Sequence, residues 1–71
     1  MKQLERLNGI SLNQRNNLID EWIFSERNRN LAKRKLIDGI TFEQLAEEFK
    51  LSVTRTKSIV YDVIDIMCEK K

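Results

Sequence analysis

The residues of this 71-residue chain best suited to binding chemistry are hydroxyl and basic side chains between positions 52 and 61. With about 100° between successive helical residues, several of them face away from an apolar stripe that contains Ile59, Val60 and Val63. They are Thr54, Arg55, Lys57, Ser58 and Tyr61. Arginine can pair with guanine edges, hydroxyls bind base edges or phosphates, and lysine suits either. The spacing therefore predicts a surface that contacts double-stranded DNA.

The distribution of charge favours the same prediction. Residues 26–38 include five basic and two acidic side chains, and residues 50–58 include three basic side chains and no acid. Between them, residues 41–49 include three acids and no base. The net charge of +2 conceals this separation, in which the basic segments lie where a DNA surface would be. A solvated basic face without a nucleic-acid role stays an alternative.

Residues for catalysis or metal binding are scarce. The chain has no histidine, and its single cysteine, Cys68, cannot form an internal disulfide. The adjacent carboxylates Glu47 and Glu48 would point about 100° apart on a helix, and there is no glycine-rich phosphate loop. We therefore expect a protein that is not an enzyme and that uses neither a metal nor a cofactor.

The apolar residues are not arranged as in a membrane protein. No apolar run approaches the ~20 residues of a membrane span. Charges also interrupt the first ten residues, where a secretory signal would need an apolar stretch. These patterns predict a cytoplasmic protein without a membrane partner.

A stable scaffold must position the predicted surface, and the composition favours helices. With no proline and two glycines the chain lacks the turn residues of a β-sheet protein, while 41% hydrophobic residues suffice for one small core. A strand in IVYDVIDIM is an alternative, although it would have no partner strand. We expect a single all-α domain over residues 1–71, built as a small bundle of four to five helices.

Capping signals locate the first helices. Ser11 has capping-box spacing to a glutamine and opens a helix over residues 12–24. Ser25 can cap a further helix over residues 26–38. One bent helix over residues 12–38 fits the periodicity as well as two helices do.

Two further helices meet at a tight corner. Thr41 opens the first of them, and Ser52 caps the second, which runs from Val53 to about residue 69. Only three residues separate the two helical patterns, which is typical of a helix-turn-helix motif. Such a motif, here over about residues 41–60, presents its second helix to the DNA major groove.

Three positions bear on this motif. The small Ala46 fits the point where the second helix crosses the first. Lys50 departs from the usual pattern, because glycine is common at this turn position. Thr56 also departs from it, because a buried valine or isoleucine is usual there.

The segment ERNRNLAKRKLIDGITFEQLAEEFKLSVTRTKSIV resembles region 4 of the bacterial sigma-70 family and the related LuxR-type DNA-binding module. The resemblance implies promoter or operator binding through the helix that begins at Val53. It implies that Thr41 and the basic helix, with Lys33 and Arg34, lie near the phosphate backbone, and it brings Ser52 into the contact surface. The small size fits a stand-alone transcriptional regulator of the kind found in phages, prophages and mobile elements.

Two other functions remain open. One is DNA packaging, as in a small terminase-like recognition domain of a phage. The other is an interaction module that docks on RNA polymerase. Selection of bound sequences from a random DNA pool would separate these functions from sequence-specific regulation.

The C-terminal helix has a wide apolar face. Six of its residues cover an arc of ~160°, whereas packing on one core needs ~100°: Ile59, Val60, Val63, Ile64, Ile66 and Met67. The surplus face could be covered by the N-terminal segment with Leu4, Leu7 and Ile10. A homodimer through this helix is the alternative.

Helical periodicity also sorts the aromatic side chains. Trp22, Phe42 and Phe49 lie on apolar stripes and are expected in the core. Phe24 falls off its stripe, and Tyr61 faces outward.

Overall fold

The computed structural model describes residues 4–70, which form a bundle of four α-helices preceded by a 3₁₀ turn, without a strand in that range. The elements are η1 (Leu4–Leu7), α1 (Leu12–Trp22), α2 (Glu26–Leu36), α3 (Phe42–Phe49) and α4 (Val53–Lys70). The expected all-α bundle is therefore confirmed. The strand alternative is wrong, because IVYDVIDIM lies within α4.

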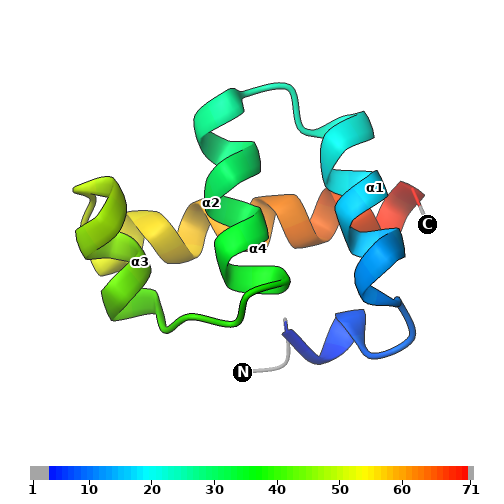
Figure 1. Ribbon diagram of the computed structural model, residues 1–71, viewed down its shortest axis with the longest axis horizontal. Coiled ribbons are helices and arrows are strands. Elements are labelled where there is room, and N and C mark those ends of the chain that lie inside the picture. The colour runs from blue at the N-terminus through cyan, green and yellow to red at the C-terminus, as the bar shows by residue number, and fades with distance from the viewer. Residues whose placement is uncertain (1–3, 71) are drawn as a thin grey trace.

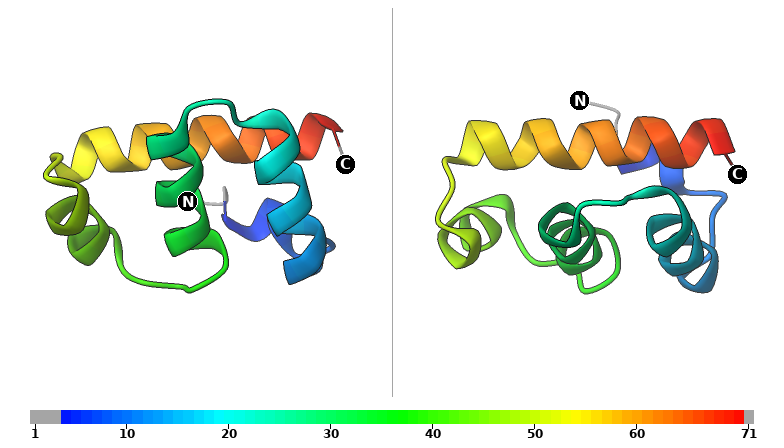
Figure 2. Two further views of the ribbon diagram at one scale, coloured as in Figure 1. Left: turned by 45° about the horizontal axis from the view of Figure 1, so that its top comes forward. Right: turned by 90° about the horizontal axis from the view of Figure 1, so that it is seen from above.

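α4 is the helix on which the rest of the molecule packs. α1, α2 and α3 lie in a row across one side of it, with α2 in the middle (Figure 1 and Figure 2). Each described element contacts α4, whereas α1 and α3 have no contact with each other. The buried residues of α4 follow helical spacing: Thr56, Ile59, Val60, Val63, Ile64 and Met67.

The helix starts follow the capping residues. The side chains of Ser11, Ser25 and Thr41 each accept a hydrogen bond from the backbone N–H three residues later. A full capping box forms at Thr41, where the Gln44 side chain accepts in return from the Thr41 N–H. At Ser11 the structure shows only the first of these two bonds.

The helix ends come earlier than the periodicity suggests. α1 and α2 each stop two residues before the expected position, so residues 12–38 form two helices. Ile23 and Ser25 are extended in the link between them, which turns the chain away from the α1 axis. After α2, Gly39 adopts a left-handed φ of 79°, a conformation in which glycine has no steric penalty.

The N-terminal segment covers the surplus apolar face of α4. Leu7 and Ile10 are buried, and η1 packs on α4. Arg6 forms an ion pair with Asp65 of α4. The side chain of Leu4, which the sequence also places here, lies outside the described residues. The N-terminal segment, which was one of the two partners expected for this face, therefore packs on it within the same chain.

The corner between α3 and α4 explains both departures from the usual motif. Lys50 takes the left-handed conformation that glycine would take, with φ 57° and ψ 45°. The N–H of Leu51 donates to the carbonyl of Ala46 at 2.8 Å, as in a Schellman-type helix end. Thr56 is fully buried, and its hydroxyl donates to the carbonyl of Ser52 at 2.9 Å. A buried threonine is thus accommodated without an unsatisfied hydroxyl.

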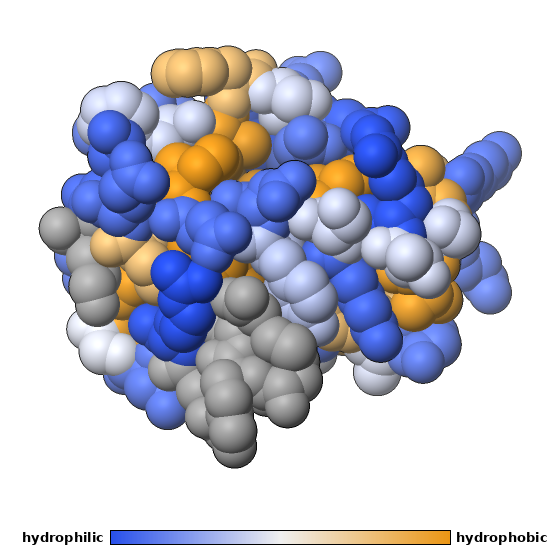
Figure 3. Space-filling view, turned by 180° about the vertical axis from the view of Figure 1, so that it is seen from behind, coloured by the Kyte–Doolittle hydropathy of each residue, from blue (hydrophilic) through white to orange (hydrophobic). Residues whose placement is uncertain are grey.

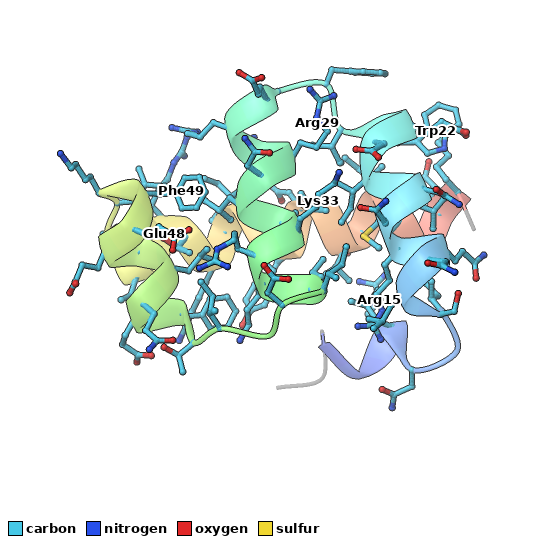
Figure 4. The ribbon with its side chains drawn as sticks, in the orientation of Figure 1. Arg15, Trp22, Arg29, Lys33, Glu48 and Phe49 are labelled. Atoms are coloured by element: carbon cyan, nitrogen blue, oxygen red, sulfur yellow. The ribbon has the colours of Figure 1, made fainter. Side chains whose placement is uncertain are left out.

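Arg15 of α1 joins three backbone segments (Figure 4). Its Nε donates to the carbonyl of Ile10 at 3.1 Å and its Nη2 to that of Leu7 at 3.0 Å. Its Nη1 donates to the carbonyl of Leu36 at 2.9 Å, at the end of α2. One guanidinium therefore holds η1, the start of α1 and the end of α2 together.

The aromatic residues divide as the sequence suggests, with one exception in the site below. Trp22, Phe42 and Phe49 are half-buried and pack against the core. Phe24, in the link between α1 and α2, is 81% exposed. Within residues 4–70, none of the helices combines the length and the apolar character that a membrane crossing requires.

Candidate nucleic-acid interface

The first two turns of α4 carry most of the predicted contact residues. Thr54, Arg55, Lys57 and Ser58 are all exposed. Their backbone is fixed by the helix start, where the Ser52 hydroxyl accepts from the Arg55 N–H at 3.1 Å. The buried Thr56 and Ile59 hold the opposite side of the same turns on the core. These four side chains therefore face solvent in the first two turns of α4.

Arg55 and Lys57 lie on two different flanks of α4. Arg55 lines a groove between α4 and the α1–α2 link. Lys57 points toward α3, where its Nζ lies 5.6 Å from the centroid of the Phe42 ring. A duplex that received α4 in its major groove would have one sugar-phosphate strand on each flank. The two cations are placed to meet different parts of such a duplex.

Tyr61 corrects one expectation. It is half-buried rather than outward-facing, and its ring meets Phe42 edge to face at 6.0 Å between centroids and 78° between planes. The helical projection placed Tyr61 correctly on α4 but could not show that the start of α3 covers it. Tyr61 therefore supports the α3–α4 corner, with part of its side chain still accessible.

Lys35 belongs to the same flank and was missed by the sequence analysis. Its Nζ lies 4.4 Å from the Phe42 ring centroid and donates to the carbonyl of Ile40 at 2.9 Å. Lys35 and Lys57 thus share one aromatic ring, although 22 positions separate them in the sequence. The only sequence signal was its place in the basic run 33–35, because its position near Phe42 depends on the path of the α2–α3 link.

The two basic residues expected at the phosphate backbone are paired with carboxylates. The Nζ of Lys33 lies 2.6 Å from the Oδ1 of Asp20 on α1. Arg34 makes a bidentate contact with Glu48 of α3, at 2.8 Å for each bond, and a second contact with Asp38 at 2.9 Å. Lys33 and Arg34 therefore tie α2 to its neighbours on both sides. Figure 4 labels Lys33 on α2 and Glu48 on α3.

These contacts affect protonation at the α2–α3 contact. Hydrogen bonds from Arg34 hold the pKa of the Glu48 carboxyl below its usual range. Hydrogen bonds from Glu48 and Asp38 in turn raise the pKa of Arg34. Both groups therefore stay charged near neutral pH, and Arg34 is satisfied within the protein.

Thr41 and Ser52 are exposed but serve as helix caps. Each hydroxyl oxygen accepts a backbone N–H, from Gln44 and from Arg55 respectively. Each hydroxyl keeps its own hydrogen for donation, so a cap can also bind a phosphate oxygen. The structure is thus compatible with contacts from both residues at the edges of the surface.

The first two turns of α4 contain no acidic side chain, and the first one along the helix is Asp62. Glu43, Glu47 and Glu48 cluster with Gln44 on the outer side of α3. Asp65, about three turns after the start of α4, is paired with Arg6. Among the described residues, no group of three or more histidine, cysteine, aspartate or glutamate side chains could hold a metal ion. The α3 acids mark a side of the molecule that would repel a phosphate backbone.

Comparisons with protein-family models, curated proteins and solved structures return no match for this chain. The geometry of the site is therefore the basis on which a function can be assigned.

Proposed function

We propose that the protein binds double-stranded DNA in a sequence-specific manner through the first half of α4. It would act in the cytoplasm as a small transcriptional regulator that resembles sigma factor region 4. The observation that carries the proposal is a contrast between two adjacent basic residues of α2 and the two basic residues near the start of α4. Lys33 and Arg34 are each paired with a carboxylate, whereas Arg55 and Lys57 form no ion pair with a described residue.

The arrangement of α4 supports this proposal in two further ways. Arg55 lies in the first turn of a helix that follows a three-residue corner, with the exposed hydroxyls of Thr54 and Ser58 beside it. Packing of α4 on three helices fixes its direction, which lowers the entropic cost of placing these side chains on a duplex. Arg55 is suited to a guanine edge, and Lys57 to a phosphate.

Selection of bound sequences from a random duplex pool tests the proposal. We expect one enriched motif. Failure to enrich any motif would contradict sequence-specific binding, and would favour the RNA polymerase-docking or packaging functions that the sequence left open.

Variants of the two cations then test the assignment of roles. Arg55→Ala should cost ~1–3 kcal/mol of binding free energy on the selected site and far less on random DNA. Lys57→Ala should weaken binding to both DNAs alike, and should reduce the slope of log affinity against log salt by about one.

Glu43→Ala, on the acidic side of α3, is the control. It should leave the affinity for the selected site and the affinity for random DNA nearly unchanged. Titrations at several salt concentrations measure all three variants. Parent-like binding by both cation variants, with helicity intact by circular dichroism, would show that α4 does not read DNA.

A further inference from the structure

An open groove runs between α4 and the α1–α2 link. Its volume is about 300 Å³, and apolar side chains such as Trp22 and Ile66 line it. Phe24 stands at its edge with 81% of its surface exposed. Figure 3 shows hydrophobic side chains gathered near this link on the side of the molecule seen from behind. The molecule thus carries a hollow and a projecting aromatic ring next to each other.

The polar lining of the groove carries one charge of each sign. Arg55 and Asp62 both line it, and neither forms an ion pair with another described residue. They are seven positions apart, which places them on the same side of α4 and about 10 Å apart along its axis. Ser58 lies between them. If a second copy of α4 runs in the opposite direction, its negative charge lies opposite the positive charge of the first copy, and the reverse.

We propose that this groove is the interface of a two-fold homodimer in which α4 packs antiparallel to α4 of a second copy. Antiparallel packing centred near Ser58 places Arg55 of each copy opposite Asp62 of the other. Because a two-fold interface repeats every contact, the Arg55–Asp62 ion pair forms twice in the dimer. Phe24 of each copy adds apolar area beside the groove of the other.

A second copy fits the groove better than an unrelated occupant, because both halves of the complementarity are present on one chain. The groove is an apolar hollow, and Phe24 is an exposed apolar side chain that a partner could cover. Arg55 and Asp62 carry opposite charges in the order that antiparallel packing requires. The interface differs from the one expected from the sequence, whose apolar surplus is covered by Leu7 and Ile10. It lies on the flank of the same helix that faces the α1–α2 link, where Ile59, Val63 and Ile66 of the wide apolar face line the groove.

The dimer does not depend on the proposed DNA binding, but it affects it. Arg55 and Ser58 belong both to the groove and to the predicted DNA surface. A copy seated in the groove therefore covers residues that a duplex needs, and the two partners exclude each other.

Sedimentation of charge-reversed variants tests the interface. The parent should form dimers as its concentration is raised to hundreds of micromolar. Arg55→Asp alone and Asp62→Arg alone should both stay monomeric, because each faces like charges across the two-fold axis. An equimolar mixture of the two variants should dimerise, because every pair in the mixed dimer again joins opposite charges.

The control is Lys57→Asp, which reverses a cation on the other flank of α4 and should dimerise like the parent. Circular dichroism checks that each variant keeps its helices, as expected for exposed positions. A parent that stays monomeric at every concentration would overturn the proposal. A mixture of the two single variants that stays monomeric, while the parent dimerises, would overturn it as well.

Discussion

At the residue scale, Arg15 shows how one side chain can set the relation of segments that are distant in sequence. It donates to carbonyls of Leu7, Ile10 and Leu36, which lie where helical hydrogen bonding begins or stops. Such carbonyls need partners when they are partly buried, and a planar guanidinium can satisfy three of them at once. Lysine has the charge but lacks the fixed fork of donors.

We therefore expect Arg15→Lys to lower the free energy of unfolding by roughly 2–3 kcal/mol, because charge-assisted bonds to partly buried carbonyls are lost. Urea denaturation followed by circular dichroism measures the change. The matched control is Arg27→Lys, since Arg27 is exposed and contacts only its neighbour Asn28. Equal losses in the two variants would show that Arg15 does not hold the segments together.

The role of Arg15 was not predictable from the sequence, for a physical reason. Its partners are backbone atoms, which carry no residue-specific signal, and their positions depend on the path of the chain before α1 and after α2. Phe24 was expected off the apolar stripe, and it is exposed, although it lies in the α1–α2 link rather than on a helix. The burial of Tyr61 was not predicted, because it comes from Phe42 on another helix. The exposure of Arg55 and Ser58 was predicted, whereas the pairing of Lys33 with Asp20 was not.

At the element scale, the corner between α3 and α4 shows why the helical conformation ends for three residues and then begins again. The stop is made by Lys50 in the left-handed conformation, and the restart by Ser52, which caps α4. An L-residue in this conformation costs ~1–2 kcal/mol, which glycine does not pay. The corner is thus well satisfied in hydrogen bonds but strained at one residue.

Lys50→Gly should therefore raise the free energy of unfolding by about 0.5–1 kcal/mol, after allowance for the greater freedom of glycine in the unfolded chain. The midpoint of urea unfolding is the measurement. Lys50→Ala removes the same charge but keeps the β-carbon, so it should leave stability near that of the parent. A gain in the alanine variant equal to that in the glycine variant would assign the effect to charge rather than to conformation.

The elements themselves were predicted well, and their ends less well. Ser11, Ser25, Thr41 and Ser52 marked the starts of the helices, because a cap bonds to its own next turn. The ends of α1 and α2 were placed two residues too late, because the apolar period continues into Ile23 and Ile37 after the helices stop. What ends each helix is the direction the chain takes afterwards, which local periodicity does not encode.

At the scale of the whole molecule, the two ends of the described chain meet on α4. Leu7 and Ile10 cover the second half of that helix, while Arg6 pairs with Asp65. A domain of this size buries only ~60% of the surface that its unfolded chain exposes, so the N-terminal segment contributes a substantial part of the core. The row of α1, α2 and α3 across α4 was not predictable from periodicity, which gives each helix a buried face but no neighbour.

Leu7→Ala should accordingly lower the free energy of unfolding by about 2–4 kcal/mol through the cavity that it leaves. Leu12→Ala is the matched control, because Leu12 is 54% exposed and should cost under ~1 kcal/mol. Unfolding should be followed by circular dichroism and by the fluorescence of Trp22, which packs on the core near the end of α4. The two signals should change together if the N-terminal segment is part of one cooperative unit. Separate transitions, or a mild effect of Leu7→Ala, would show that this segment is an independent attachment.

The position of α4 as the shared packing surface has a consequence for how the protein is made. Among the described helices α4 is synthesised last, and a ribosome adding ~5–20 residues per second needs about 1–4 s for its 18 residues. Until then η1 and the first three helices have no common surface on which to bury Leu7, Leu31 and Leu45. We therefore expect the complete core to form only after α4 has been synthesised, so that a translation stop inside α4 leaves α1, α2 and α3 without the helix on which all three pack.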